Sequence, residues 1–203
     1  IYGNYKFGND WRPNSNFKTT NGYIYLSKKI SKKTKISIEF TKMYYLAQQA
    51  GGLTDIMFNE DPSQSNRTRN WFNVDWLLFN SKLLHKINSK NTYSISINLL
   101  QANRDALGFR SNRVDQVDPF KERDLIKGEF NNFSFETKYI SNNNIISFPT
   151  LSLLGFKYYE SNNFSFQGPG SLGVDPDFDF IKSLYYPYQS SYNYPNKNVS
   201  LFT

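Results

Sequence analysis

The chemistry open to this sequence depends first on its seven arginines. All of them lie in, or at the edge of, long polar segments: Arg12, Arg67, Arg69, Arg104, Arg110, Arg113 and Arg123. A guanidinium presents a planar fork of donors that matches a carboxylate or a phosphate, whereas lysine presents a point charge. Six residues of these segments, two glutamines among them, are therefore candidates for binding an anionic ligand: Gln48, Gln49, Arg67, Arg69, Arg104 and Arg110.

Two structural roles compete with ligand binding for the same arginines. They could form salt bridges between loops, because acidic residues lie in the same segments: Asp55, Glu60, Asp61, Asp105 and Asp118. They could also contact anionic lipid at a membrane surface. The sequence leaves these alternatives open, since arginines at a surface commonly have such partners.

No group of residues predicts catalysis or a resident cofactor. The chain has no Cys, which excludes disulfides, thiol catalysis and cysteine-ligated metals. His85 is the only His, so a histidine metal site or a Ser-His-Asp triad lacks its parts. We therefore expect neither an enzyme nor a metal site.

Two motifs in the last polar segment match the residue patterns of ligand-binding loops only in part. Three aspartates have the spacing that opens a calcium-binding loop: Asp175, Asp177 and Asp179. Phe180 and Tyr186 stand where an EF-hand needs Gly and Glu, so a loose cation site is the most that this run predicts. Residues 168–173 read G-x-G-x-x-G, but no helix-forming sequence follows, as a dinucleotide site requires. We interpret that segment as a flexible loop.

The dominant sequence period is two residues. Apolar and polar side chains alternate in four clear stretches: 36–41, 72–78, 93–99 and 133–139. Such alternation predicts β-strands with one apolar and one polar face. Helical periodicity is weak, and the best helix candidate is a single turn at Asp55–Phe58.

Short and long connections alternate along the chain. Three short polar turns are predicted: Ser31–Thr34, Asn88–Asn91 and Ser141–Asn144. Three long polar connections follow them in alternation: Gln48–Asn70, Arg104–Lys127 and Ser161–Pro195. Each has roughly 20 residues or more, which is unusual within a compact soluble domain. This order is typical of an up-and-down β-barrel in the bacterial outer membrane, with short periplasmic turns and long extracellular loops.

Strand length favours the same architecture. Eight strand segments can be counted, from Ile1–Gly8 to Asn198–Thr203. The full segments have about 9–17 residues, whereas a membrane strand needs about 9–11 and soluble strands mostly have about 5–6. We therefore predict an all-β fold in which residues 1–203 form one antiparallel, up-and-down segment of a transmembrane β-barrel. The first and last segments look cut off, so we expect an open piece of a larger barrel.

Aromatic residues make up 18% of the chain and fall at two predicted levels. One group lies where strands meet long connections: Tyr44, Tyr45, Trp71, Tyr158 and Tyr159. Tyr93 and Tyr139 lie near short turns. Two such levels would form the interfacial girdles of a membrane barrel, and aromatics that pack a soluble core are the alternative. The net charge of +7 does not predict a nucleic-acid partner, because the aromatics fall on apolar faces and the arginines in loops.

Two adjacent segments carry a resemblance to a known family. They read AQQAGGLTDIMF at 47–58 and DPSQSNRTRNWF at 61–72, and they resemble TonB-dependent receptors of the ferric-dicitrate-transporter type. Three further segments are similar to the same family and follow in the same order: RDALG at 104–108, LIKGEF at 125–130 and YPNKNVSLF at 194–202. One departure is Ser63, where members of the family often carry Arg, and it bears on whether ferric dicitrate is the substrate.

The resemblance implies a barrel of about 22 strands in the cell outer membrane, closed by a plug, which imports a ferric siderophore or ferric citrate. The implied partners are an anionic metal-chelate ligand, outer-membrane lipid, and a TonB complex reached through parts outside these 203 residues, the plug among them. The alternative is an outer-membrane β-barrel for binding or adhesion without active transport. An isolated open piece would have unpaired edges, so we expect stability only within the complete barrel.

Overall fold

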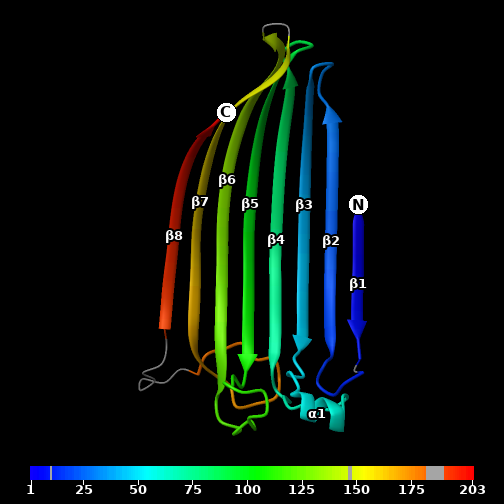
Figure 1. Ribbon diagram of the computed structural model, residues 1–203, viewed down its shortest axis with the longest axis vertical. Coiled ribbons are helices and arrows are strands. Elements are labelled where there is room, and N and C mark those ends of the chain that lie inside the picture. Colours follow the sequence, from blue (N-terminus) through cyan, green and yellow to red (C-terminus); the bar gives the residue numbers. More distant parts are fainter. Residues whose placement is uncertain (10, 146–147, 182–189) are drawn as a thin grey trace.

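Eight long strands form one antiparallel sheet, and their order in space is their order in the chain (Figure 1). The computed structural model describes four stretches of the chain: residues 1–9, 11–145, 148–181 and 190–203. The strands are β1 (Tyr2–Gly8), β2 (Phe17–Lys29), β3 (Thr34–Gln48), β4 (Trp71–Lys86), β5 (Asn91–Gly108), β6 (Arg123–Ile145), β7 (Phe148–Gly170) and β8 (Ser190–Phe202). The predicted all-β, up-and-down arrangement of eight strands is confirmed.

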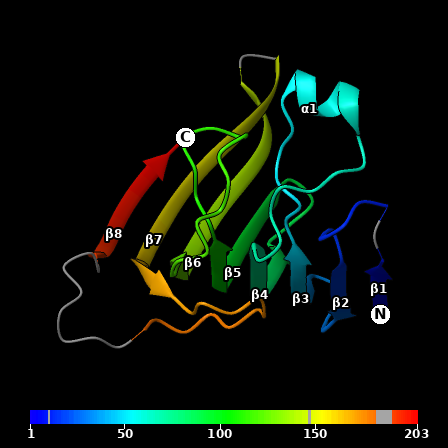
Figure 2. The same ribbon diagram turned by 90° about the horizontal axis from the view of Figure 1, so that it is seen from below.

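The sheet is a single open layer. β1 and β8 are not paired with each other, so each has one edge without a partner strand. Figure 2 shows the strands in one twisted row, and no second sheet packs on them among the described residues. The buried hydrophobic residues of the described chain are few, and most lie near the long loops: Leu46, Ala47, Ala50, Leu107 and Leu125. Most of the sheet therefore has no core of its own.

Two of the predicted short turns are confirmed. At Ser31–Thr34, the Thr34 N–H donates to the Ser31 carbonyl oxygen over 3.4 Å. Before β5, the side-chain oxygen of Asn88 accepts hydrogen bonds from the backbone N–H groups of Lys90 and Asn91, both at 2.9 Å. Asparagine closes turns in this way because its side chain reaches the backbone two residues farther on.

The third predicted turn, Ser141–Asn144, is wrong in position. These residues belong to β6, where Ser141 lies opposite Asn91 and donates to Asn91 Oδ1 over 2.7 Å. The next residues of β6 pair with β7, and residues 146–147, between the two strands, lie outside the described residues. Asparagines favour turns locally, but here the pairing of an already formed ladder outweighs that preference.

The long connections lie together at one end of the sheet, opposite the short turns (Figure 1). We call 49–70, 109–122 and 171–181 the first, second and third long loops. The first loop is close to the predicted Gln48–Asn70 and contains the predicted helical turn as α1 (Asp55–Glu60). The side-chain oxygen of Thr54 caps α1 by accepting a hydrogen bond from the Met57 N–H. No helix among the described residues is long and apolar enough to cross a membrane.

The other two long connections are shorter than predicted. Arg104–Lys127 is wrong at both ends, because Arg104–Gly108 pairs with residues 124–128 of β6. Ser161–Pro195 is wrong for the same reason, since Ser161–Gly170 remains in β7, together with the first glycines of the G-x-G-x-x-G segment. β6 and β7 thereby reach 23 residues each. The polar side chains at the ends of β6 and β7 predict loops from the sequence. Strand pairing nevertheless continues there, because it needs only backbone donors and acceptors.

Candidate functional site

The strand register divides the side chains between two faces. Directly opposed residues share a face, and successive residues along one strand alternate between faces. The Leu99 face contains the row Ile24, Phe40, Phe79, Leu99 and Phe133. The Asn98 face contains the row Glu39, Asn80, Asn98, Ser134 and Tyr159. We divide the sheet at these two rows. The turn half contains the two rows and all strand residues between them and the short turns, and the loop half contains the strand residues between them and the long loops.

In the turn half, the Leu99 face is largely apolar and exposed. Its polar members include Lys28, Ser81, Thr137, Glu160 and Lys197. Its side chains from β2 to β8 include Leu26, Ile38, Ile95, Ile97, Phe135, Leu154, Phe156, Val199 and Leu201. Leu26 is 58% exposed and Leu201 is 78% exposed. We call this surface the apolar band; on β5 it extends from Tyr93 to Leu99, about 20 Å at roughly 3.3 Å per residue. An extended, mostly apolar surface of this kind marks contact with another molecule or with lipid.

The Asn98 face of the turn half is polar. Asn80 donates to Asn98 Oδ1, and Asn98 donates to Ser134 Oγ over 3.0 Å, so side-chain hydrogen bonds join β4, β5 and β6. An open hollow of about 580 Å³ lies over this ladder, and Glu39 and Lys82 stand at its side. Polar side chains on this face are therefore placed around a water-accessible space.

The two faces exchange polarity in the loop half. There the Leu99 face carries polar and charged side chains: Lys42, Asn73, Asp75, Gln101, Asn103, Glu129 and Asn131. Lys42 and Asp75 form an ion pair. At the same level the Asn98 face carries larger apolar groups: Met43, Tyr45, Val74, Trp76 and Phe130. The apolar band therefore ends at one level instead of following the strands to the long loops.

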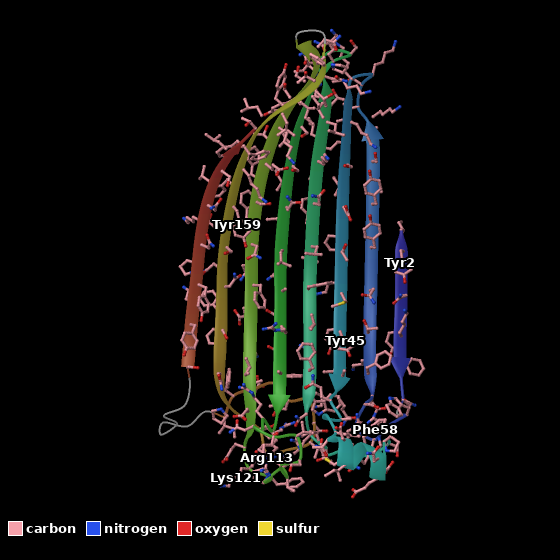
Figure 3. The ribbon with its side chains drawn as sticks, viewed as in Figure 1. Tyr2, Tyr45, Phe58, Arg113, Lys121 and Tyr159 are labelled. Atoms are coloured by element: carbon pink, nitrogen blue, oxygen red, sulfur yellow. The ribbon has the colours of Figure 1, made fainter. Side chains whose placement is uncertain are left out.

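The predicted aromatic levels are confirmed only in part. Tyr93 and Tyr139 lie directly opposite each other on the Leu99 face, near the short turns. Tyr45 lies near the long loops, but Tyr159 lies much farther toward the short turns (Figure 3). The aromatic residues predicted to lie where strands meet long connections therefore do not share one level, because β7 continues to Gly170.

A buried arginine joins the three long loops to one another. The Arg69 side chain is 1% exposed, and its guanidinium donates to both carboxylate oxygens of Asp118 over 2.7 Å. It also donates to the carbonyl oxygen of Lys121 over 2.9 Å and to that of Leu172 over 3.0 Å. One side chain of the first loop therefore contacts both the second and the third loop.

Arg123 and Arg67 extend this set of contacts. Arg123 is fully buried and donates to carbonyl oxygens in the first and third loops over 2.9–3.1 Å. Arg67 is 5% exposed and donates to Ser111 Oγ in the second loop over 2.7 Å. We call Arg67, Arg69 and Arg123 the arginine clamp, since together they hold the loop end of the sheet in one arrangement.

Asp118 carries the negative charge that the clamp encloses. Burial by itself would raise the pKa of Asp118, but hydrogen bonds from Arg69 and from the Phe120 N–H, with the positive charge of Arg69, hold that pKa below its ordinary value of 3.8. These donors lie 2.7–2.8 Å from the carboxylate oxygens. Charge-assisted hydrogen bonds of this length stabilise the ionised form against desolvation.

Three of the six predicted ligand-binding residues have internal partners in the structure. Arg67 and Arg69 belong to the clamp, and the pair of Arg69 with Asp118 is one of the predicted loop–loop salt bridges. Gln48 accepts a hydrogen bond from Asn16 over 3.1 Å. Their donors and acceptors serve the packing of the loop end.

The other three lie near the loop end of β5, where the Arg104 guanidinium stacks over the Phe130 ring at 5.8 Å. Gln49 and Arg110 line one small pocket with Ala106 and Asp124. Arg104 is exposed and lies on the same face of β5, two residues before Ala106. Gln49, Arg104 and Arg110 therefore remain the candidates for ligand contact, and Asp124 is a neighbour that the sequence did not single out.

The structure brings together no cluster of metal ligands. Within the four described stretches, no group of three or more His, Cys, Asp or Glu residues could hold a metal ion. The Asp177 N–H donates to the Asp175 carbonyl oxygen over 2.8 Å, so this aspartate run forms a tight turn. Sequence reasoning also passed over the lysines on the Asn98 face, although period-two alternation was sufficient to group them.

Comparison with known proteins gives a likeness in fold. The chain matches no protein-family model, and no curated protein matches its sequence. A crystal structure of the ferric citrate transporter FecA in its unliganded form is similar over 97% of this chain, with a TM-score of 0.67 and 16% identical residues. The sheet has the fold of a β-barrel segment. The chain spans 29% of the FecA chain, and at this identity the likeness concerns the fold alone.

Replacing Arg69 by Ala in the complete protein should loosen all three long loops. The change leaves the buried Asp118 carboxylate without its partner, and breaking a buried ion pair in this way costs about 3–5 kcal/mol. Hydrogen exchange of the backbone in 109–122 should become much faster than in the unmodified protein. Arg113→Ala is the matched control, because the Arg113 side chain is 76% exposed beside Asp115. Equal protection in both variants would contradict the clamp.

The clamp should also weaken in acid. Because the pKa of Asp118 is lower in the folded protein than its ordinary 3.8, ionised Asp118 stabilises the fold above that value, and the stabilisation is lost as the pH falls from 3.8 through the folded pKa. Intrinsic-rate-corrected exchange of 109–122 should therefore accelerate in that window. Asp118→Asn should show fast exchange at neutral pH and no further acceleration in that window; an unchanged acid response would assign the effect to another group.

Proposed function

We propose that this sheet is part of an outer-membrane β-barrel receptor that imports an anionic metal chelate, such as a ferric siderophore or ferric citrate, with energy from a TonB system. The apolar band is the observation that carries the proposal. A membrane barrel needs an apolar outer surface of limited height and a polar inner surface. The fold likeness to FecA, named as a ferric citrate transporter, and the resemblance of 47–72 to TonB-dependent receptors support the choice of receptor class.

The border of the apolar band fits the edge of a lipid bilayer, and its height lies within one. On β5 the band covers roughly 20 Å along the strand. Because barrel strands tilt by about 35–45°, this is about 15 Å along the membrane normal, within the apolar band of about 25 Å in outer-membrane barrels. On the long-loop side of the border, Gln101 and Asn131 take the place of apolar residues on the Leu99 face, as expected where strands leave the hydrocarbon. The Leu99 face then faces lipid, and the Asn98 face lines the interior.

The proposed ligand site lies at the loop end of that interior. Arg104 and Arg110 are exposed there, and Gln49 shares a pocket with Arg110. Their guanidinium forks suit the carboxylates of a metal chelate, with the amide of Gln49 as a further donor. The clamp arginines contribute indirectly, by holding the loops that carry this site.

A barrel for binding or adhesion without active transport is the second candidate. The arginine clamp favours it, because loops fixed by buried ion pairs form a constant outer surface. The two candidates differ in uptake: both would bind a ligand at the loop end, and only the first would carry it inward.

Neighbouring cysteines should report the two faces directly. In the complete protein in outer membranes, Ser96→Cys should react with a membrane-impermeant maleimide added from the aqueous side, whereas Ile97→Cys should stay protected by lipid. This chain has no Cys of its own, so both labels are unambiguous within it. A fluorophore at residue 97 should be quenched by nitroxide-labelled lipid. Reversed labelling would assign the lipid to the Asn98 face and overturn the proposal.

Removing both exposed arginines should weaken uptake. The double variant Arg104→Ala/Arg110→Ala of the complete protein should need about tenfold more ferric citrate for half-maximal uptake, as expected for loss of charge-assisted hydrogen bonds. Arg113→Ala, in the same loop as Arg110, should transport normally. Unchanged uptake by the double variant would exclude these arginines from the ligand site, and binding without uptake by the unmodified protein would favour the adhesion alternative.

A further inference from the structure

Lysines gather on the Asn98 face of the turn half. Six strand lysines belong to this surface: Lys29, Lys35, Lys82, Lys86, Lys138 and Lys157. Lys29 and Lys35 are directly opposite each other in the β2–β3 hairpin. Lys82 lies one row toward the long loops, opposite Ser37. All but Lys138 are exposed.

This arrangement is unfavourable for the sheet alone. Like charges directly opposite each other on neighbouring strands are destabilising. Among the described residues, Lys138 has an ion-pair partner, Glu136, at 2.5 Å, whereas Lys29, Lys35, Lys82 and Lys157 form no ion pair within 4 Å. The same surface carries two carboxylates, Glu39 and Glu136, and Glu136 also lies opposite Lys157. Ammonium groups therefore outnumber carboxylates on this surface, which leaves an excess of positive charge.

Hydroxyl groups lie between these charges. Ser27 is opposite Ser37, and in the same row Ser96 lies between Lys82 and Glu136. A serine hydroxyl donates one hydrogen bond and rotates to suit its acceptor. Ammonium and hydroxyl groups together offer many donors to an anion, with no single fixed geometry.

We propose that Lys29, Lys35, Lys82 and Lys157, with the serines between them, form an anion-binding track for multivalent carboxylate ligands on the Asn98 face of the turn half. The proposal rests on the function proposed above, in which this face lines the interior. Lysine ammonium groups are point charges on flexible stems, so they attract an anion without holding it in one orientation. A passage requires binding that is favourable at several sites and weak at each. The arginines at the loop end would select the ligand, and the lysines would keep it within the interior.

The test compares two charge-matched double variants of the complete protein in detergent. Lys29→Gln/Lys35→Gln removes two lysines of the track, and Lys18→Gln/Lys28→Gln removes two exposed lysines of the Leu99 face from the same strand, β2. The probe is citrate, and calorimetry measures its dissociation constant at low ionic strength. The track variant should bind citrate about tenfold more weakly, and the control should bind within about twofold of the unmodified protein.

A second pair protects the result against a local folding defect. Lys82→Gln/Lys157→Gln should weaken citrate binding by a similar factor. Unchanged affinity in both track variants, or an equal loss in the control, would overturn the inference. The labelling of residues 96 and 97 separates the two proposals: if Ser96→Cys reacts from water while citrate binding is unaffected by the lysines, the track fails and the receptor function stands. Labelling with the faces reversed would remove both.

Discussion

An unbroken antiparallel register from β1 to β8 is the constraint on which every surface of this sheet depends. Side chains alternate between faces at each residue, so a slip of one position would move Ile95 and Ile97 to the side of Ser94 and Ser96. Backbone pairing maintains the register over 23 residues in β6 and β7. The Asx-turn at Asn88 fixes where β5 begins. The apolar band, the polar ladder and the lysine surface all follow from this pairing.

The loop end is stabilised by a different interaction. Loops leave carbonyl oxygens without strand partners, and such groups need donors when they are buried. A guanidinium has five N–H donors in a fixed fork, so Arg69 and Arg123 each satisfy several oxygens at once. Arginine therefore supplements the small aliphatic core at this end, which includes Leu107 and Leu125.

Much of the fold could be predicted from the sequence, because period-two alternation reflects a local geometric rule. The strands follow from it directly, and the short polar stretches between them predict two of the turns. The ends of β6 and β7 could not be predicted, since polar residues such as Ser161 give no contrast between strand and loop. The role of the arginines was equally hidden: Arg69 and Arg104 look alike in sequence, but only the three-dimensional path of the loops brings Asp118 to Arg69.

The polarity exchange between the two halves has a mechanical consequence. In the barrel proposed above, shifting the sheet by one row, about 7 Å along its strands, would draw Lys42, Gln101 and Asn131 to the edge of the hydrocarbon. A basic residue on the lipid side costs up to about 1 kcal/mol near the interface and about 2–4 kcal/mol at the midplane, so the cost grows with further displacement, and a shift the other way would expose the apolar band to water. A wall with this pattern resists displacement along the membrane normal in both directions.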